Sequence, residues 1–129
     1  MPDTRQPAAR HTGVGRWGEQ IAVDTLVAGG YAIVERNWRC GHLELDIIAR
    51  KDNVMVFVEV KTRSADYADG VSAVDMRKRS RMVRSADTYL RMLPHDYDFR
   101  FDIIAINGTP ESYTVEHIPD AFLPSLRRY

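Results

Sequence analysis

The 129-residue chain has a single cysteine, Cys40, and no net charge. One thiol cannot form an internal disulfide, which excludes a disulfide-stapled secreted scaffold and favours a cytoplasmic protein. The longest apolar runs, residues 54–58 and 103–106, are far shorter than the roughly 20 residues that cross a bilayer. Residues 1–12 contain no apolar segment typical of a secretory signal. We therefore expect no membrane partner.

Histidine is also sparse, and the four histidines are too scattered to give the paired spacing of a zinc site. The chain contains no Gly-x-Ser-x-Gly motif, and Cys40 has no neighbouring motif typical of a thiol nucleophile. These absences exclude zinc hydrolases, zinc fingers and hydrolases that use a nucleophile elbow. The histidines are His11, His42, His95 and His117.

The length and balanced composition fit one folded domain. Hydrophobic residues make up 44% and charged residues 28% of the chain, close to the average of globular proteins. A chain of this length can bury a hydrophobic core without disulfides. We expect a flexible leader over residues 1–12, which are polar, one domain over residues 13–122, and a C-terminal tail over residues 123–129.

Hydrophobic periodicity predicts a helix, three strands, a second helix and two further strands. The short connections between the first three strands favour antiparallel pairing, so the sequence predicts an α/β domain with a mixed sheet. The expected elements are helix 15–28, strands 31–37, 43–50 and 54–62, a helix capped by Ser72 and ended by Pro94, strands 99–107 and 113–118, and a short helical turn from Pro119.

The second predicted helix carries an excess of positive charge, with six basic residues and one acid between residues 77 and 91. We expect its apolar side, formed by Met76, Val83, Ala86, Leu90 and Leu93, to face the core. A basic stripe is typical of phosphate contacts to nucleic acid, although a solvated arginine-rich face has the same pattern. The basic residues are Arg77, Lys78, Arg79, Arg81, Arg84 and Arg91.

Acidic side chains interrupt two otherwise apolar strands. Glu59 and Lys61 lie two residues apart in the third expected strand, and Glu44 and Asp46 lie two apart in the second. Side chains two residues apart point to the same face of a strand. If the two strands pair through their short turn, Asp46 and Glu59 come close together on one side of the sheet.

Two carboxylates beside one lysine in an apolar setting require neutralisation. Mg²⁺ is suited to this because it prefers carboxylate oxygens and water, and Mn²⁺ accepts the same ligands. Such a metal polarises a phosphodiester oxygen and lowers the pKa of a bound water, while Lys61 would stabilise charge on the phosphorane. The pattern fits a phosphodiesterase site. A Glu–Lys pair on a solvated rim is the alternative.

Several segments, in the same order along the chain, resemble the PD-(D/E)xK, or restriction-endonuclease-like, superfamily. More narrowly, the chain is similar to the YraN-like family of small bacterial proteins, over residues 13–122. One position departs from that pattern, since Leu43 stands where the family usually has glycine. The matching segments are Gly18-Glu19, residues 36–40 (RNWRC), 44–49 (ELDIIA) and 56–63 (VFVEVKTR), Ala73-Val74 with Lys78, residues 100–106 (RFDIIAI), and His117-Ile118.

The resemblance implies a restriction-endonuclease-like αβββαβ core and a metal-dependent nuclease. It assigns Asp46 and Glu59 as metal ligands and Lys61 as the catalytic lysine. Glu19 is implied to support the metal and the reaction, directly or through a water. The similarity extends to archaeal Holliday-junction resolvases, which implies branched DNA as a substrate. The expected phosphate contacts are Arg63, Lys78, Arg77, Arg81 and Arg84.

Two functions from different classes follow from the sequence. The first is a Mg²⁺- or Mn²⁺-dependent endonuclease that acts on DNA. The second is a non-catalytic nucleic-acid-binding or partner-binding module on the same fold. The presence of Asp46, Glu59 and Lys61 together favours the enzyme. The oligomeric state stays open between a monomer and a homodimer.

Overall fold

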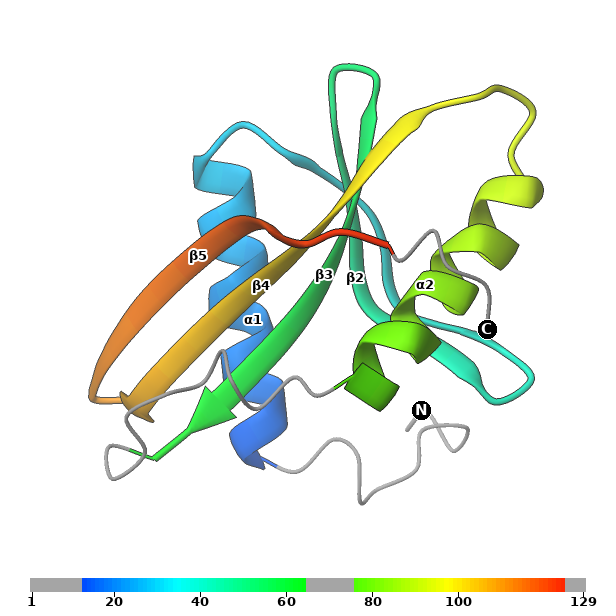
Figure 1. The fold of residues 1–129 in the computed structure, drawn as a ribbon. Coiled ribbons are helices and arrows are strands. Elements are labelled where there is room, and N and C mark those ends of the chain that lie inside the picture. Colours follow the sequence, from blue (N-terminus) through cyan, green and yellow to red (C-terminus); the bar gives the residue numbers. More distant parts are fainter. Residues whose placement is uncertain (1–12, 65–75, 125–129) are drawn as a thin grey trace, which may run out of the picture.

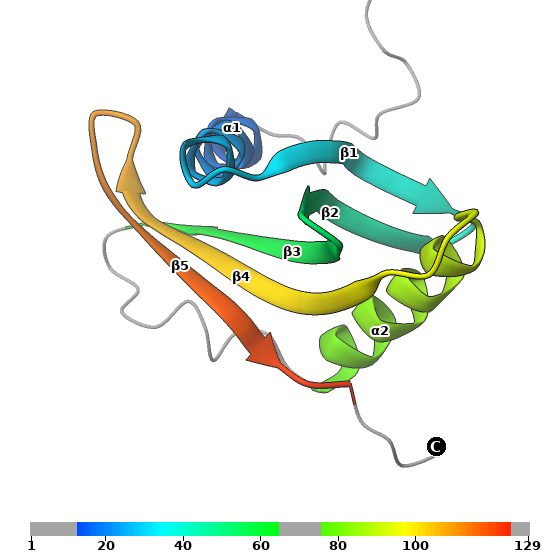
Figure 2. The ribbon, with the colours of Figure 1, turned by 90° about the horizontal axis from the view of Figure 1, so that it is seen from above.

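A computed structural model of the protein describes residues 13–64 and 76–124. Over these residues, two helices cover opposite faces of one five-stranded sheet (Figures 1 and 2). The predicted leader, the Ser72 cap and the tail beyond residue 124 lie outside the described residues. The elements are α1 (Gly13–Ala28), β1 (Ala32–Cys40), β2 (Leu43–Lys51), β3 (Val54–Arg63), α2 (Met76–Arg91), β4 (Asp98–Thr109) and β5 (Ser112–Phe122).

The strands lie side by side in chain order, β1-β2-β3-β4-β5. β1, β2 and β3 form an antiparallel meander, β3 and β4 are parallel, and β4 and β5 are antiparallel. The parallel pair requires a long crossover connection, which contains α2. The predicted mixed α/β sheet and the αβββαβ order of the resembled fold are both confirmed.

The central strand β3 is buried on both faces. Val56 and Val58 pack in the cluster under α1, whereas Met55 and Phe57 pack in the cluster under α2. A strand covered on both sides is expected to have a continuous apolar run, as residues 54–58 have. The polar residues that follow, from Glu59 onward, therefore leave the double-sided core at the carboxyl end of β3.

The helix α1 approaches this end of β3 closely at Gly18. A Cβ atom at position 18 would overlap the side chain of Thr62, so only glycine permits the observed separation of helix and strand. At the other end of α1, Gly30 adopts a positive φ of 90°, and the N–H of Tyr31 donates to the carbonyl of Leu26 at 3.0 Å. The predicted glycine stop is confirmed.

The predicted apolar side of α2 is confirmed except at its first position. Ala86 is buried, and Val83 and Leu90 pack against the cluster under α2, as does Leu93 just beyond the helix, whereas Met76 is 70% exposed. The core also includes a neighbouring strip of the helix, where the ring of Trp38 from β1 meets Tyr89 edge-on at 5.4 Å. The buried residues of α2 are Met82, Ser85, Ala86 and Tyr89.

The helical turn predicted from Pro119 is wrong, because β5 continues as a strand to Phe122. The ring of Phe122 stacks on that of Phe101 in β4, with centroids 5.0 Å apart. An irregularity in the pairing of β4 and β5 accompanies a positive φ of 55° at Asp120. The stacking holds the last residues of β5 in the sheet. Local sequence propensity does not predict such tertiary packing.

Candidate active site

The strands β2 and β3 separate at the candidate site. Their paired register ends at Ile47 and Val58. Beyond that point, the backbone N–H of Val60 donates a hydrogen bond to Asp46 Oδ2 at 3.0 Å. The carboxylate thus replaces the carbonyl that a continuing neighbour strand would offer. This local role fixes Asp46 beside the end of β3.

Glu59 and Lys61 share the α2 face of β3, as their spacing predicts. Lys61 Nζ lies 3.9 Å from Glu59 Oε2. Lys78, in the first turn of α2, lies closer to the same oxygen, with its Nζ at 2.9 Å. Glu59 itself is only 5% exposed. The carboxylate is therefore buried and compensated from both the strand and the helix.

Asp46 and Glu59 line one small pocket, so the prediction that they meet on one side of the sheet is confirmed. The pocket has a volume of about 60 Å³ and lies between the β1–β2 hairpin, β3 and the beginning of α2. Glu44 also reaches it, consistent with the face that it shares with Asp46. The lining residues are His42, Glu44, Asp46, Glu59, Lys78, Arg81 and Met82.

The charges of this pocket do not fully compensate one another. Burial, together with the adjacent Glu59, raises the pKa of Asp46 to about 8, although the Val60 N–H and Lys78 favour its ionised form. Burial also lowers the pKa of Lys61 against the opposing effect of Glu59. For Lys78, burial lowers the pKa but Glu59 more than compensates, so the net pKa is raised. Asp46 is thus the group whose charge is least well accommodated.

Glu19 lies apart from the pocket lining. It is 7% exposed, and its Oε2 accepts a hydrogen bond from Asn37 Nδ2 at 2.9 Å, with Arg36 Nε at 3.5 Å. Its charge still contributes to the raised pKa of Asp46. The structure therefore places Glu19 near the acidic pair with partners of its own, and its metal-supporting role stays a prediction.

Within residues 13–64 and 76–124, no three His, Cys, Asp or Glu side chains are grouped as a metal site. The two carboxylates of the pocket are nevertheless a donor set that fits Mg²⁺, which commonly takes one or two protein carboxylates and completes its shell with water and substrate phosphate. Burial and Glu59 raise the pKa of Asp46, and a cation bound beside it would favour the ionised form. Asp46 and Glu59 would hold such a metal.

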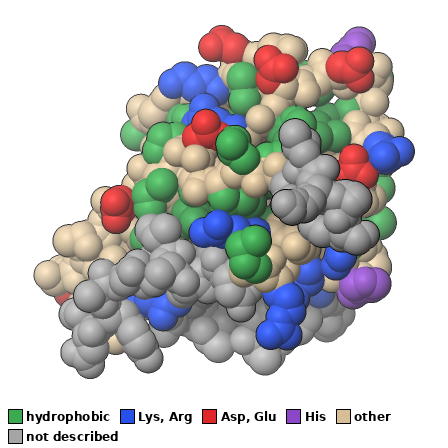
Figure 3. Space-filling view, in the orientation of Figure 1, with side chains coloured by type: hydrophobic (Ala, Val, Ile, Leu, Met, Phe, Trp, Pro, Cys, Tyr) green, Lys and Arg blue, Asp and Glu red, His purple; other side chains and the backbone are tan. Residues whose placement is uncertain are grey.

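The predicted phosphate contacts do not all gather at the pocket. Arg81 and Lys78 line it, whereas Arg77 and Arg84 are exposed elsewhere on α2. Arg63 is half-buried at the last position of β3. Lys and Arg side chains gather over the first turns of α2 (lower right of Figure 3). This surface adjoins the carboxylates, so the pocket opens onto a basic rim.

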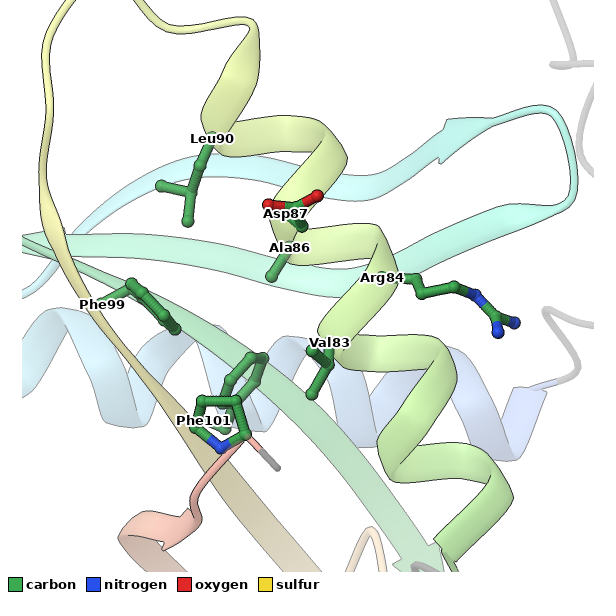
Figure 4. Close-up of a pocket in the computed structure, with 8 residues that line it drawn as sticks. Val83, Arg84, Ala86, Asp87, Leu90, Phe99 and Phe101 are labelled. Atoms are coloured by element: carbon green, nitrogen blue, oxygen red, sulfur yellow. The ribbon is translucent and has the colours of Figure 1, made fainter. Parts of the chain in front are cut away.

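A larger pocket of about 240 Å³ lies on the other flank of α2, between the helix and β4. Its walls are mainly apolar, with Phe99 and Phe101 facing Val83 and Leu90 (Figure 4). Arg84 stands at the rim and extends away from the two phenylalanines. Its described lining contains one carboxylate, that of Asp87, and therefore lacks the carboxylate pair of the smaller pocket.

Sequence reasoning missed two residues near the site. His42 lines the pocket, but its isolated position among scattered histidines gave no signal; only its place in the turn before Glu44 could have indicated proximity to Asp46. Asn37 has a positive φ of 54° and holds Glu19. Asparagine tolerates that conformation better than most residues, but the sequence could not show which carboxylate it would meet.

Comparison with known proteins identifies the family of this chain. The model of the family described as "Uncharacterised protein family UPF0102" matches residues 18–106. The chain belongs to this family. A UPF0102 protein of Bacteroides thetaiotaomicron is 47% identical over 119 residues, covering 92% of this chain and 98% of the relative. One from Bacteroides fragilis is 46% identical over 119 residues, with the same coverage. One from Myxococcus xanthus is 42% identical over 120 residues, covering 90% and 93%.

UPF0102 is the family that the sequence resemblance indicates under the name YraN-like, so that prediction is confirmed. The matched segment contains Glu19, Asp46, Glu59, Lys61 and Lys78. The family's description assigns no activity. Across the described residues, neither helix has the length and hydropathy that crossing a membrane requires.

Proposed function

We propose that this UPF0102 protein is a metal-dependent endonuclease that hydrolyses phosphodiester bonds in DNA. One observation carries the proposal: Asp46 and Glu59, from neighbouring strands, line a single pocket whose rim is basic. Lys61 shares the face of Glu59, with its Nζ 3.9 Å from the carboxylate. Paired carboxylates beside an amine are the groups that metal-assisted hydrolysis requires.

The metal is proposed to be Mg²⁺, with Mn²⁺ as a substitute, held by Asp46 and Glu59. When bound, such an ion would polarise a phosphate oxygen and lower the pKa of a coordinated water. Ionised Asp46 would be favoured because a divalent charge outweighs the repulsion from Glu59. Hard oxygen ligands in a small polar pocket suit these cations and do not suit a thiophilic metal.

The chain's own residues divide the remaining tasks. Lys61 is proposed to stabilise the negative charge that develops on the phosphorane or to orient the attacking water, since its ammonium group lies beside the carboxylate face. Arg81 lines the same pocket and is proposed to bind a phosphate of the DNA backbone. Such contacts position a duplex without reading its sequence. A preference for branched DNA rests on the resemblance to archaeal Holliday-junction resolvases.

The test uses end-labelled duplex, single-stranded and four-way-junction DNA, each with Mg²⁺, Mn²⁺ or EDTA. We expect metal-dependent nicking and, in Lys61→Ala, a loss of rate of about 100-fold or more, typical when a charge-stabilising group is removed. Lys51→Ala is the matched control, because Lys51 donates a hydrogen bond to the carbonyl of Gly29 at the other end of α1, away from the pocket. Intact DNA in every metal condition, or full activity in Lys61→Ala, would contradict the proposal.

One observation favours a second function, a non-catalytic nucleic-acid-binding or partner-binding module. Lys78 Nζ compensates Glu59 at 2.9 Å, and Glu19 has Arg36 and Asn37 as partners, so both carboxylates have basic or amide partners within the chain. In that case, DNA would bind equally well in EDTA and in Mg²⁺ and remain uncut. Fluorescence anisotropy in the two buffers, measured beside the cleavage assay, separates the two functions.

A further inference from the structure

Glu59 Oε2 has two lysine ammonium groups near it, and the nearer one comes from the helix. Lys78 Nζ lies 2.9 Å away, whereas Lys61 Nζ lies 3.9 Å away. The shorter distance is that of a charge-assisted hydrogen bond, and the longer one exceeds hydrogen-bond reach. Lys78 is thus the lysine that directly occupies this oxygen.

That occupancy competes with a metal. A divalent ion such as Mg²⁺ binds a carboxylate oxygen at about 2.1 Å. An ammonium group at hydrogen-bond distance from the same oxygen would be strongly repelled in a pocket with little solvent. Glu59 is 5% exposed, so water screens two cations at its oxygen only weakly. Lys78 must therefore leave Oε2 when a metal arrives there.

Lys78 is placed where it can make this movement. Its side chain is 34% exposed, against 6% for that of Glu59, and a lysine stem is long and flexible. It lies in the first turn of α2, on the rim of the pocket beside Arg81. A DNA phosphate bound at Arg81 would offer the displaced ammonium group a new anion within the same pocket.

We propose that Lys78 is a positioning residue that occupies Glu59 in the metal-free protein and transfers to a DNA phosphate when a divalent metal binds. This inference rests on the proposed nuclease function. It has one consequence beyond that function: binding of the metal and binding of DNA strengthen each other. Once either ligand is bound, Lys78 has already left Glu59, so the other ligand binds without that unfavourable step. Such coupling is reciprocal by thermodynamic necessity.

The test measures Mn²⁺ affinity without DNA, from the electron paramagnetic resonance signal of free Mn²⁺. We expect Lys78→Met to bind Mn²⁺ roughly fivefold to tenfold more tightly than wild type, since a directly competing charge has left a largely desolvated oxygen. Lys61→Met and Arg81→Met each also remove one positive charge near the pocket, and about a twofold effect is expected from that general change. Lys78→Arg, which keeps the charge, should stay near wild type.

Two controls keep the result interpretable. Glu59→Gln should abolish the tight Mn²⁺ site and thereby locate the measured binding. Lys78→Gln replaces Lys78→Met if the apolar side chain prevents folding, and a larger increase in melting temperature on adding Mn²⁺ than in wild type is a second measure of the same affinity change.

The outcomes separate this inference from the proposed function. Tighter Mn²⁺ binding in Lys78→Met upholds the role of Lys78 even if no DNA is cut. Unchanged or weaker Mn²⁺ binding in Lys78→Met, or an equal gain in all three charge-removing variants, overturns it even if the wild-type protein is an active nuclease. Absence of Mn²⁺ binding in both wild type and Lys78→Met overturns the inference and the metal dependence together.

Discussion

Asp46 on the α2 face of the sheet and Asp102 on the α1 face perform the same local task. Each carboxylate accepts a hydrogen bond of 3.0 Å from a backbone N–H, that of Val60 and that of Asp120 respectively. Each sits where strand pairing ends or becomes irregular. In both places, an aspartate oxygen satisfies a donor that the neighbouring strand has released.

Their surroundings differ in how completely the charge is compensated. Arg100 Nε and Nη2 bond the two oxygens of Asp102 at 2.9 and 3.0 Å, and His117 Nε2 lies 2.7 Å from Oδ2. Tyr31 in turn accepts a hydrogen bond from Arg100. Burial would raise the pKa of Asp102, but the hydrogen bonds from His117, Arg100 and the Asp120 N–H outweigh it and lower the pKa.

At Asp46, burial and a second carboxylate act in the same direction, and its pKa is raised. The comparison teaches that a buried aspartate is structural when its donors are all supplied by the fold. A buried aspartate whose charge the fold leaves partly uncompensated is a candidate functional group, and at Asp46 we propose that an external cation supplies the missing charge. Four predictions test this distinction, in order of decreasing effect.

Asp102→Asn is expected to lower the free energy of unfolding by about 3 kcal/mol, the scale for breaking a buried ion pair. The NH₂ group of the new side-chain amide would face Arg100 or His117, and two hydrogen-bond donors cannot bond each other. Urea unfolding at neutral pH measures the loss. Asp87→Asn is the matched control, because Asp87 is exposed and its ion pair with Arg91 lies on the surface, where such pairs contribute little. If Asp102→Asn were as stable as wild type, the structural role of Asp102 would be contradicted.

The acid dependence of this loss has a definite sign. Because the folded pKa of Asp102 lies below its ordinary value of 3.8, its stabilising contribution is present above that value. The contribution disappears as the pH falls through the lower, folded pKa. The difference between wild type and Asp102→Asn should therefore narrow only in strongly acidic solution.

Gly18→Ala is expected to destabilise the protein by about 2 kcal/mol, since the added methyl group overlaps Thr62 and forces α1 away from the acidic end of β3. Gly29→Ala is the control, because a Cβ there meets only ordinary contacts from 3.5 Å. A double variant with Thr62→Gly should recover part of the loss in urea unfolding. No coupling between positions 18 and 62 would show that the helix shifts freely.

Asp46→Asn is expected to stabilise the metal-free protein by about 1–2 kcal/mol, the opposite sign to Asp102→Asn, because it removes a poorly compensated charge. The amide oxygen can still accept the Val60 N–H. A carboxyl group with a raised folded pKa stabilises at low pH and loses that contribution as the pH rises toward about 8. Melting temperatures in EDTA should thus show a larger benefit at alkaline than at acidic pH; a lower melting temperature throughout would make Asp46 structural.

Excess Mg²⁺ is expected to stabilise the wild-type protein by about 1 kcal/mol, the linkage energy for a ligand at several times its Kd. Removing the metal with EDTA should reverse the shift. Glu59→Gln should show no shift, whereas Asp102→Asn, despite its lower melting temperature, should keep it. Calorimetric scans of the three proteins provide the measurement. An equal shift in Glu59→Gln would place the metal elsewhere.

Much of the fold was predictable because it depends on local pattern. The apolar run of β3, the glycine stop of α1 and the short turns of the meander each follow from periodicity or from backbone conformation. The burial of Tyr89 in α2 and the last part of β5 were not, since their contacts with Trp38 and Phe101 come from other strands. Residue spacing placed Glu59 beside Lys61 because both lie in one strand, but spacing does not show which residues of different elements meet.

The sequence by itself determined which chemical groups are present and which of them share a strand face, because side-chain alternation is a property of the extended backbone. Only the tertiary structure decided their partners. The separation of β2 from β3 turned Asp46 toward Val60, the packing of α2 brought Lys78 to Glu59, and β5 supplied His117 to Asp102. The charge state of a buried carboxylate depends on donors from distant parts of the chain, and those distances are set by packing.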